Sequence, residues 1–246
     1  MRTPGRHVLR FSFVAVALVL AGAGCGGRIG MPEPGTQQGG AVIDLWRVMF
    51  WTAAALGGFV LALLGWCIVR YRRRGDDGLP PQVRGNVPLE VVFFGVPLVI
   101  VAVIFVLSLR TEAATSGAGR ARALRVDVTG FQWQWRFDYP AHDVTVIGTP
   151  QEPAEMVLPA GRPVRLHLHT TDVIHSFFVP GFLGKKDLIP GLDHDLRLRP
   201  VRPGRYQGYC AEFCGLNHAR MNFSVRILPA DEFDRWTARA TGGPGR

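Results

Sequence analysis

Two long apolar segments dominate the first half of the chain. The stretches from Val48 to Val69 and from Val91 to Leu109 contain no charged residue. Each is long enough to cross a bilayer as a helix, because a transmembrane helix needs about 20 mostly apolar residues. The pattern predicts a two-helix transmembrane hairpin over residues 42–110, with helices at about 46–70 and 88–110.

Beyond residue 111 the pattern changes to short segments in which apolar and polar residues alternate. Gly and Pro separate these segments, which is typical of antiparallel β structure. We expect at least five strands, in segments 124–128, 131–137, 164–169, 196–200 and 222–228. Acidic residues after Pro229 indicate the first turn of a short terminal helix. Residues 111–246 are therefore expected to form an all-β sandwich or barrel with a short C-terminal helix.

The first 25 residues resemble a secretory signal peptide. Three arginines precede the apolar run FSFVAVALVLAGAG, which is short for a membrane span. Cys25 at the end of this run is typical of a bacterial lipoprotein signal, although Gly22 matches that signal poorly. Lipid attachment at Cys25 and ordinary cleavage or retention therefore both stay open. Residues 26–41 are rich in Gly and Pro and are expected to form a linker.

The formal net charge of +9 raises the question of a nucleic-acid partner. Much of the positive excess lies in the signal and in RYRRRG at 70–75, between the two apolar segments. A basic run in that place sets membrane topology, and we expect no nucleic-acid partner. By the positive-inside rule the loop is cytoplasmic, so the β domain is expected on the extracytoplasmic side.

The candidate chemistry lies in CAEFCGLNHARM at 210–221. This segment contains Cys210, Cys214, His218 and Met221. A disulfide between the two cysteines is the simplest interpretation for an exported domain, but it leaves Met221 without a role. With His175 from DVIHSFF, the donors are two thiolates, two imidazoles and one thioether.

The known types of metal site differ in how well they fit these five donors. Zinc takes four donors and seldom a thioether, and mononuclear blue copper needs only one cysteine. If both thiolates bridge two ions, then two histidines, one methionine and one main-chain carbonyl complete two four-coordinate sites. Soft sulfur together with imidazole favours copper. A pair of copper ions with these ligands would carry electrons, and we do not expect it to catalyse hydrolysis.

The order of two apolar segments, DVIHSFFVP, KKDLIPG and CAEFCGLNHARM resembles subunit II of the haem-copper cytochrome c oxidases, over about residues 42–236. The resemblance implies a cupredoxin-like Greek-key barrel with a binuclear copper centre, CuA. It implies as copper ligands His175, Cys210, Cys214, His218, Met221 and the main-chain oxygen of Glu212. It also implies a magnesium ion bound by the Glu212 side chain and shared with subunit I. No haem is expected in this chain, because it contains no C-x-x-C-H motif.

Two further residues gain a role from the resemblance. Trp133 in FQWQWRFDY matches the aromatic residue that receives electrons from cytochrome c, whereas the alternation alone predicts one core-facing row of rings from Phe131 to Phe137. Glu90 matches a carboxylate at the cytoplasmic entrance of a proton pathway in the partner subunit. A glutamate that merely lies at the membrane interface is the alternative for Glu90.

The resemblance thus implies an electron-input subunit of a proton-translocating oxidase in the bacterial plasma membrane. Its partners would be subunits I and III and cytochrome c, with oxygen reduced to water in subunit I. The alternatives are a membrane-anchored copper chaperone and a quinol oxidase subunit II.

The chain departs from the family pattern at four positions, and four acidic residues are candidates for docking a basic cytochrome. The departures are Phe177, Leu192, Arg220 and Asn222, and the acids are Asp138, Asp143, Glu152 and Asp187.

Overall fold

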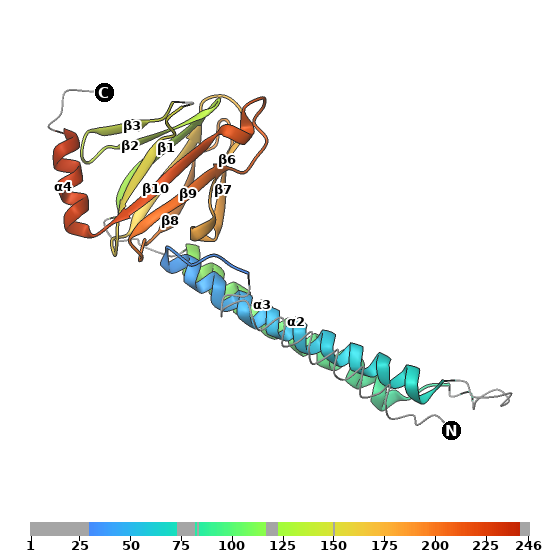
Figure 1. Ribbon diagram of the computed structural model, residues 1–246. Coiled ribbons are helices and arrows are strands. Elements are labelled where there is room, and N and C mark those ends of the chain that lie inside the picture. Colours follow the sequence, from blue (N-terminus) through green and yellow to red (C-terminus); the bar gives the residue numbers. More distant parts are fainter. Residues whose placement is uncertain (1–29, 73–81, 83, 117–122, 150, 242–246) are drawn as a thin grey trace, which may run out of the picture. The chain divides into compact units, whose positions relative to one another are not determined.

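The computed structural model describes residues 30–72, 82, 84–116, 123–149 and 151–241 (Figure 1). The expected signal peptide with Cys25, and much of the arginine-rich loop, lie outside the described residues. The chain divides into two compact units. One comprises Met1–Met31 and Leu45–Leu109, and the other comprises Pro32–Asp44 and Arg110–Arg246.

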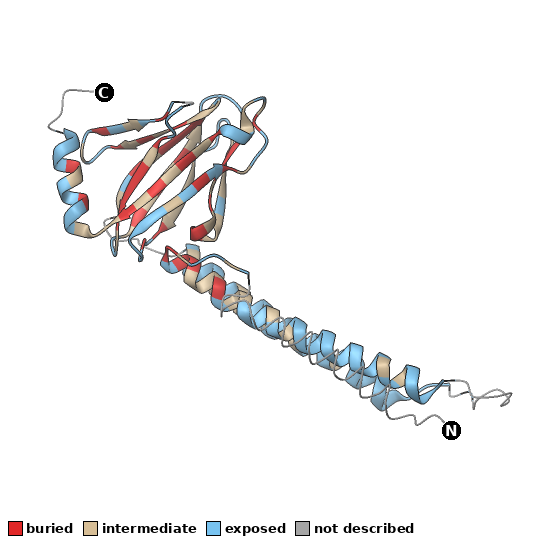
Figure 2. Ribbon diagram, viewed as in Figure 1, coloured by how far each residue is buried: buried red, intermediate tan, exposed pale blue. Residues whose placement is uncertain are grey.

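Two long helices carry the apolar segments, α2 (Gln37–Arg70) and α3 (Val87–Ser116). Both are long and apolar enough to cross a membrane, and no residue in their most apolar stretches is buried. Large apolar side chains such as Leu61 and Phe94 are 70% and 79% exposed, and Figure 2 shows this exposure along both helices. Exposed apolar surface of this extent is stable in lipid, where the helix satisfies its own backbone polar groups.

The start of α2 and the end of α3 differ from the predicted ones, whereas the end of α2 and the start of α3 agree with them. Helix α2 begins at Gln37, inside the range predicted as linker, and α3 continues to Ser116, inside the range assigned to the β domain. Thr36 caps α2, because its hydroxyl oxygen accepts a hydrogen bond from Gly39 N at 3.0 Å. The first turns of α2 also bury Ile43. The local cap and the burial of Ile43 together stabilise a Gly-containing start that sequence composition marks as a loop.

The second unit contains two five-stranded sheets that face each other (Figure 1). Their strand orders are β3-β2-β1-β5-β8 and β4-β10-β9-β6-β7. The strands are β1 (Leu124–Phe131), β2 (Gln134–Tyr139), β3 (Val144–Ile147), β4 (Glu155–Pro159), β5 (Val164–Thr170), β6 (His175–Val179), β7 (Gly184–Leu188), β8 (His194–Leu198), β9 (Gly204–Cys210) and β10 (Asn222–Leu228). The predicted fold class, two apolar helices followed by an all-β domain, is confirmed.

The sheets are mixed, which the prediction of antiparallel structure missed. Strand β1 pairs in parallel with β5, and β4 pairs in parallel with β10. Parallel neighbours need long connections, so strands that are adjacent in space are distant in sequence. Local alternation reports the buried face of each strand but carries no information on such pairing.

One predicted strand, 131–137, is interrupted. Strand β1 ends at Phe131 and β2 begins at Gln134, with a turn at Gln132 and Trp133 whose peptide bond is cis. Trp135 and Phe137 do point into the core, where they are at most 1% exposed, but Trp133 lies in the turn and is only half-buried. The prediction of one continuous row of rings was therefore wrong. Aromatic residues continue at every second position through the turn, so the sequence pattern does not show that the strand is interrupted there.

An aromatic cluster fills the centre of the sandwich. The ring centroids of Phe177 and Phe223 are 4.8 Å apart, and those of Trp135 and Phe223 are 5.0 Å apart. Gly208 faces this cluster, and a Cβ atom at that position would overlap the Phe223 ring. The close approach makes a glycine necessary there, since a core packed to this density has no room for an added methyl group.

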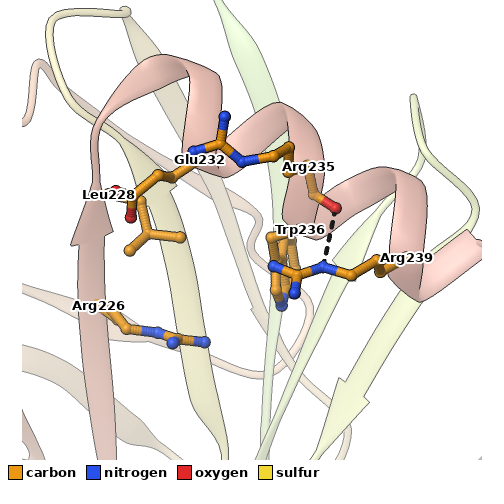
Figure 3. Close-up of a pocket in the computed structure, with 6 residues that line it drawn as sticks. All are labelled: Arg226, Leu228, Glu232, Arg235, Trp236 and Arg239. Atoms are coloured by element: carbon orange, nitrogen blue, oxygen red, sulfur yellow. Dashed lines mark hydrogen bonds between the residues drawn. The ribbon is translucent and has the colours of Figure 1, made fainter.

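The short helix expected after Pro229 is α4 (Ala230–Thr241). It packs on the sandwich through Phe233, which is 1% exposed, and through Trp236, whose ring lies 5.2 Å from that of Tyr139. Figure 3 shows a pocket lined by residues of β10 and α4, where the Arg239 guanidinium donates a hydrogen bond to the main-chain oxygen of Arg235 at 3.2 Å. Helix α4 therefore has one apolar face on the core, and its exposed residues carry charges of both signs, with Arg235 paired to Asp231 at 2.9 Å.

Candidate metal centre

Three strand ends place the candidate ligands together. His175 is the first residue of β6, Cys210 is the last residue of β9, and Met221 directly precedes β10. Strand β9 pairs with both β6 and β10, so these ends meet at one edge of the sheet. The main-chain N–H of Cys210 donates to Met221 O at 3.0 Å, which closes the base of the loop between them.

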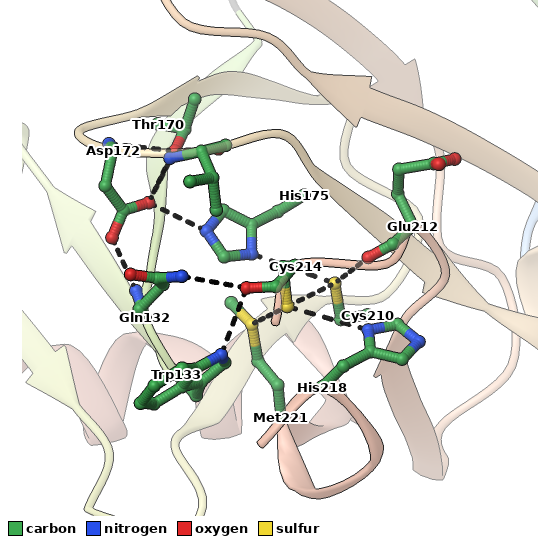
Figure 4. Close-up of polar contacts among 11 residues, drawn as sticks. Gln132, Trp133, Thr170, Asp172, His175, Cys210, Glu212, Cys214, His218 and Met221 are labelled. Carbon is green, nitrogen blue, oxygen red and sulfur yellow. Dashed lines mark hydrogen bonds and ion pairs between the residues drawn. The ribbon is translucent and has the colours of Figure 1, made fainter. Parts of the chain in front are cut away.

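The ligand atoms of His175, Cys210 and Cys214 all lie within 4.8 Å of one another (Figure 4). The two sulfur atoms are 3.8 Å apart. Both cysteines are free thiols and both are buried. The structure therefore does not adopt the disulfide that the C-x3-C spacing made the simplest interpretation.

The remaining donors are distributed over the two sulfur atoms. His175 Nδ1 lies 3.8 Å from Cys210 Sγ, and His218 Nδ1 lies 3.6 Å from Cys214 Sγ. The main-chain oxygen of Glu212 is 3.2 Å from Cys210 Sγ, and Met221 Sδ is 3.7 Å from Cys214 Sγ. Each sulfur atom thus has one imidazole nitrogen and one weaker donor beside it.

The two thiols differ in acidity. Burial opposes ionisation of Cys210, but hydrogen bonds from His175 and from main-chain groups outweigh it and lower the pKa of this thiol below its ordinary value. Burial and the negative charge of Cys210 raise the pKa of the Cys214 thiol above its ordinary value. Two adjacent thiolates are therefore unstable without a cation between them, and a metal ion that binds both sulfurs releases the second proton.

Asp172 orients the first imidazole. Its Oδ1 lies 2.9 Å from His175 Nε2, so the protonated Nε2 faces the carboxylate and Nδ1 faces the sulfur atoms. Burial of Asp172 would raise its pKa, but hydrogen bonds from Gln132 N and His175 outweigh burial and lower it. The sequence analysis missed Asp172, although its place three residues before His175 in DVIHSFF was a usable signal.

The turn between β1 and β2 contacts the loop between β9 and β10, residues 211–221, which is called the metal loop below. Gln132 Nε2 and Trp133 Nε1 both donate hydrogen bonds to Cys214 O, at 2.9 and 3.1 Å (Figure 4). Gly215 follows with a φ of 113°, a value that L side chains rarely adopt. Trp133 is thus a direct neighbour of the metal loop, and Gln132 is a second contact that sequence reasoning did not find.

Trp135 supports the same site from the core. Its indole N–H donates to Met221 O at 3.4 Å, and its ring centroid lies 6.4 Å from that of His175. Trp135 is 1% exposed. This residue therefore joins the aromatic core to two of the candidate ligands.

Other sequence-predicted residues lie as follows. The Glu212 carboxylate points away from the sulfur atoms (Figure 4) and lies 3.7 Å from Lys185 Nζ. Glu90 is in the first turn of α3, where Asn86 N donates to its Oε1 at 3.4 Å. The magnesium role of Glu212 and the proton-pathway role of Glu90 stay predictions.

Two departures from the family pattern, Arg220 and Asn222, flank Met221. Arg220 is exposed in the turn that precedes Met221, and Asn222 pairs with Tyr209 as the first residue of β10. Met221 itself is 1% exposed and directs its sulfur atom at Cys214. The polar flanks therefore point outward, and the ligand position is held by the strand.

Sequence identity to known proteins shows which family the chain belongs to. It is 32% identical to a protein of Streptomyces avermitilis named "Probable cytochrome c oxidase subunit 2", over 95% of this chain and 87% of the relative. The chain belongs to the cytochrome c oxidase subunit 2 family. A second member of this family, from Streptomyces coelicolor, is 33% identical with the same coverage. The resemblance stated from the sequence is thereby confirmed.

The family match includes the candidate centre. A sequence model described as "Cytochrome C oxidase subunit II, periplasmic domain" matches residues 150–228, which contain all six candidate copper ligands. A solved structure of the periplasmic domain of subunit II of Bradyrhizobium japonicum is 30% identical, with a TM-score of 0.45, and covers 49% of this chain and 95% of that chain. As a family member with two apolar helices, the chain is a membrane protein with an extracytoplasmic C-terminal domain.

Proposed function

We propose that this chain is the electron-input subunit of a cytochrome c oxidase and holds the binuclear copper centre CuA. The observation that carries the proposal is the convergence of His175, Cys210 and Cys214 within 4.8 Å. His218, Met221 and the main-chain oxygen of Glu212 lie against the same two sulfur atoms. This donor set supports the proposal, because two four-coordinate sites that shared both thiolates would need these donors.

The donor set fits copper better than zinc. A thioether and two thiolates are soft ligands, and the imidazoles add the nitrogen donors that copper favours. Zinc would leave Met221 without a role, since structural zinc sites seldom use thioether. Copper held by these residues would supply one-electron redox chemistry.

The residues of this chain keep such a site rigid. Asp172 fixes the ring of His175, and Gln132 and Trp133 fix the loop through Cys214 O. His175 is fully buried, and Cys214 and Met221 are at most 3% exposed, so water is largely excluded. A rigid, dry set of ligands limits rearrangement when the charge of the site changes.

Trp133 is the proposed point at which electrons from cytochrome c reach the centre. The indole is half-buried and its N–H is bonded to the metal loop, so it joins the surface to Cys214. The proposed docking acids are partly engaged within the domain. Asp138 pairs with Arg136 at 2.8 Å, and Asp187 accepts from Ser176 at 2.7 Å. Electrostatic docking through these carboxylates is therefore a weaker part of the proposal.

Replacement of Trp133 by phenylalanine tests this role. We expect copper loading to be retained, because Gln132 still donates to Cys214 O. Electron transfer from reduced cytochrome c should fall about 10- to 100-fold, since small misplacements of a positioning group cost up to about 100-fold. Trp236→Phe on α4 is the matched control. Equal rates in the two variants would exclude Trp133 as the input residue.

Several finer parts belong to the same proposal. The partners are subunits I and III and cytochrome c, in a bacterial plasma membrane, with oxygen reduced to water in subunit I and proton translocation coupled to it. Glu90 would serve the proton pathway of the partner, and the Glu212 carboxylate would bind a magnesium ion at the contact with subunit I. The copper chaperone alternative uses the same ligands and differs from the proposal in how much copper is bound and how it is paired.

Metal stoichiometry on the full chain in detergent tests the proposal. After reduction and copper addition, we expect about two copper ions per chain and an EPR spectrum of one unpaired electron shared by both ions, since two bridging thiolates couple them. A single copper ion per chain would support the chaperone alternative. Preferential zinc binding, or a quantitative Cys210–Cys214 disulfide that no reductant converts to a copper site, would refute both.

A further inference from the structure

A groove of about 390 Å³ lies in the second unit, called the outer domain below, and none of the candidate copper ligands lines it. Its walls are the first turns of α2, the last turn of α3, and strands β7 and β8. All of these residues belong to the unit of Pro32–Asp44 and Arg110–Arg246. Strands β7 and β8 are each the edge of a sheet, so the groove occupies an opening of the sandwich.

Two cations line this groove without an acidic partner. Lys186 on β7 and Arg197 on β8 are half-buried, and neither forms an ion pair within the part of the chain that the structure describes. The one carboxylate of the groove, Asp195, is engaged by Arg165 at 2.8 Å and His167 at 3.2 Å.

The neighbouring strand adds to the positive charge. Arg197 stands opposite Arg165 across the β5–β8 pair, and Arg165 stands opposite Arg125 across the β1–β5 pair. Asp195 pairs with Arg165 and Asp127 pairs with Arg125, which leaves the charge of Arg197 uncompensated. Like charges in register destabilise a sheet, and an anion beside Arg197 would remove this cost.

A buried amide of the groove also lacks a partner. Gln38 is 9% exposed, and its Oε1 accepts a hydrogen bond from Arg199 N at 2.9 Å. This bond fixes the orientation of the amide. The Nε2 group is buried and has no acceptor among the described residues. A buried donor without an acceptor costs free energy, so Gln38 offers an N–H group to a ligand oxygen.

The other side of the groove is apolar. Val42, Phe182 and Leu183 form part of it, next to the hydroxyl groups of Thr115 and Ser116. A ligand that satisfies both sides has an anionic oxygen-rich head and an apolar body. The walls include the ends of the two helices that are long and apolar enough to cross a membrane.

We propose that this groove binds an anionic phospholipid of the extracytoplasmic leaflet. The phosphate lies between Lys186 and Arg197 and accepts a hydrogen bond from Gln38 Nε2, and the upper acyl chains lie against Val42 and Phe182. Such a lipid fills the opening between β7 and β8 and holds the first turns of α2 on the sandwich. This site is independent of the copper centre and of its proposed function.

The test uses the full chain, purified in detergent and stripped of lipid. Retained lipid is measured by native mass spectrometry after addition of phosphatidylglycerol or phosphatidylcholine. We expect a clear preference for phosphatidylglycerol. The double variant Lys186→Gln/Arg197→Gln should weaken phosphatidylglycerol binding about 30-fold, and Lys186→Gln alone about fivefold, because each cation near a lipid headgroup contributes a factor of about five.

The matched control is Arg235→Gln/Arg239→Gln on α4, which removes the same charge outside the groove. It should retain the wild-type preference, and copper loading should be unchanged in both double variants. Equal retention of the two lipids, or equal loss in the control, would overturn the site. Displacement of phosphatidylglycerol by millimolar inorganic phosphate would overturn the lipid assignment in favour of a soluble anion.

Discussion

Cys210→Ser is expected to abolish the copper pair and to lower cytochrome c oxidation by more than about 100-fold. Changes in residues that only orient a metal ligand already cost about 10- to 100-fold in affinity or activity. Cys210 is a proposed ligand itself, and its sulfur is the one beside His175 Nδ1 and the Glu212 carbonyl. A serine oxygen is a hard, poorly acidic donor and cannot bridge two copper ions as thiolate does.

The control for this substitution is Cys67→Ser. Cys67 is also a free cysteine, but it lies in α2 and outside the candidate centre. The Cys67→Ser variant should keep the wild-type copper content and the shared-electron EPR spectrum. Copper content and spectrum are measured on the full chain, and cytochrome c oxidation on the assembled oxidase. A Cys210→Ser protein that still shows the shared-electron spectrum would contradict the bridging role of this sulfur.

Trp135→Ala is expected to lower the free energy of unfolding of the outer domain by about 4 kcal/mol, within the range measured for large aromatic residues in cores. The side chain is 1% exposed and packs against Phe177 and Phe223. The substitution leaves a cavity beside His175 and removes the hydrogen bond to Met221 O. Copper binding should therefore weaken together with stability.

Urea unfolding followed by circular dichroism measures this effect on the full chain. Trp236→Ala is the control, because Trp236 is only partly buried and lies on α4, apart from the candidate ligands. We expect the control to lose about half as much stability or less, since the cost follows the burial of the removed atoms, and to keep its copper affinity. A Trp135→Ala protein with normal copper affinity would show that the aromatic core does not support the ligands.

The positions of the candidate ligands were accessible from sequence because they are local. Cys210, Cys214, His218 and Met221 lie in one short loop, and surplus donors argued against a simple disulfide. His175 was counted with them as a possible donor from its residue type and from the resemblance, since nothing in its local pattern reports that β6 and β9 are neighbours. The structure brings its imidazole to Cys210 because those two strands pair.

Residues that orient the ligands were harder to find. Gln132 reads as one position in an alternating strand, and only the turn between β1 and β2 directs its amide to Cys214 O. The same turn takes Trp133 out of the strand, so that it packs against the core only partly buried. A period of two is kept across a short turn, so the sequence pattern does not distinguish the two arrangements.

The sequence by itself determined the two apolar helices, the all-β domain and the chemical type of the candidate site, because these depend on composition, periodicity and local spacing. The resemblance of its motifs indicated the family. Only the tertiary structure decided which strands are neighbours, where α2 begins and α3 ends, and which residues orient His175 and Cys214. It also decided that Lys186, Arg197 and Gln38 share one groove. The physical reason is that hydrogen bonds and charge pairs between distant segments depend on strand pairing, and pairing leaves no local trace in the sequence.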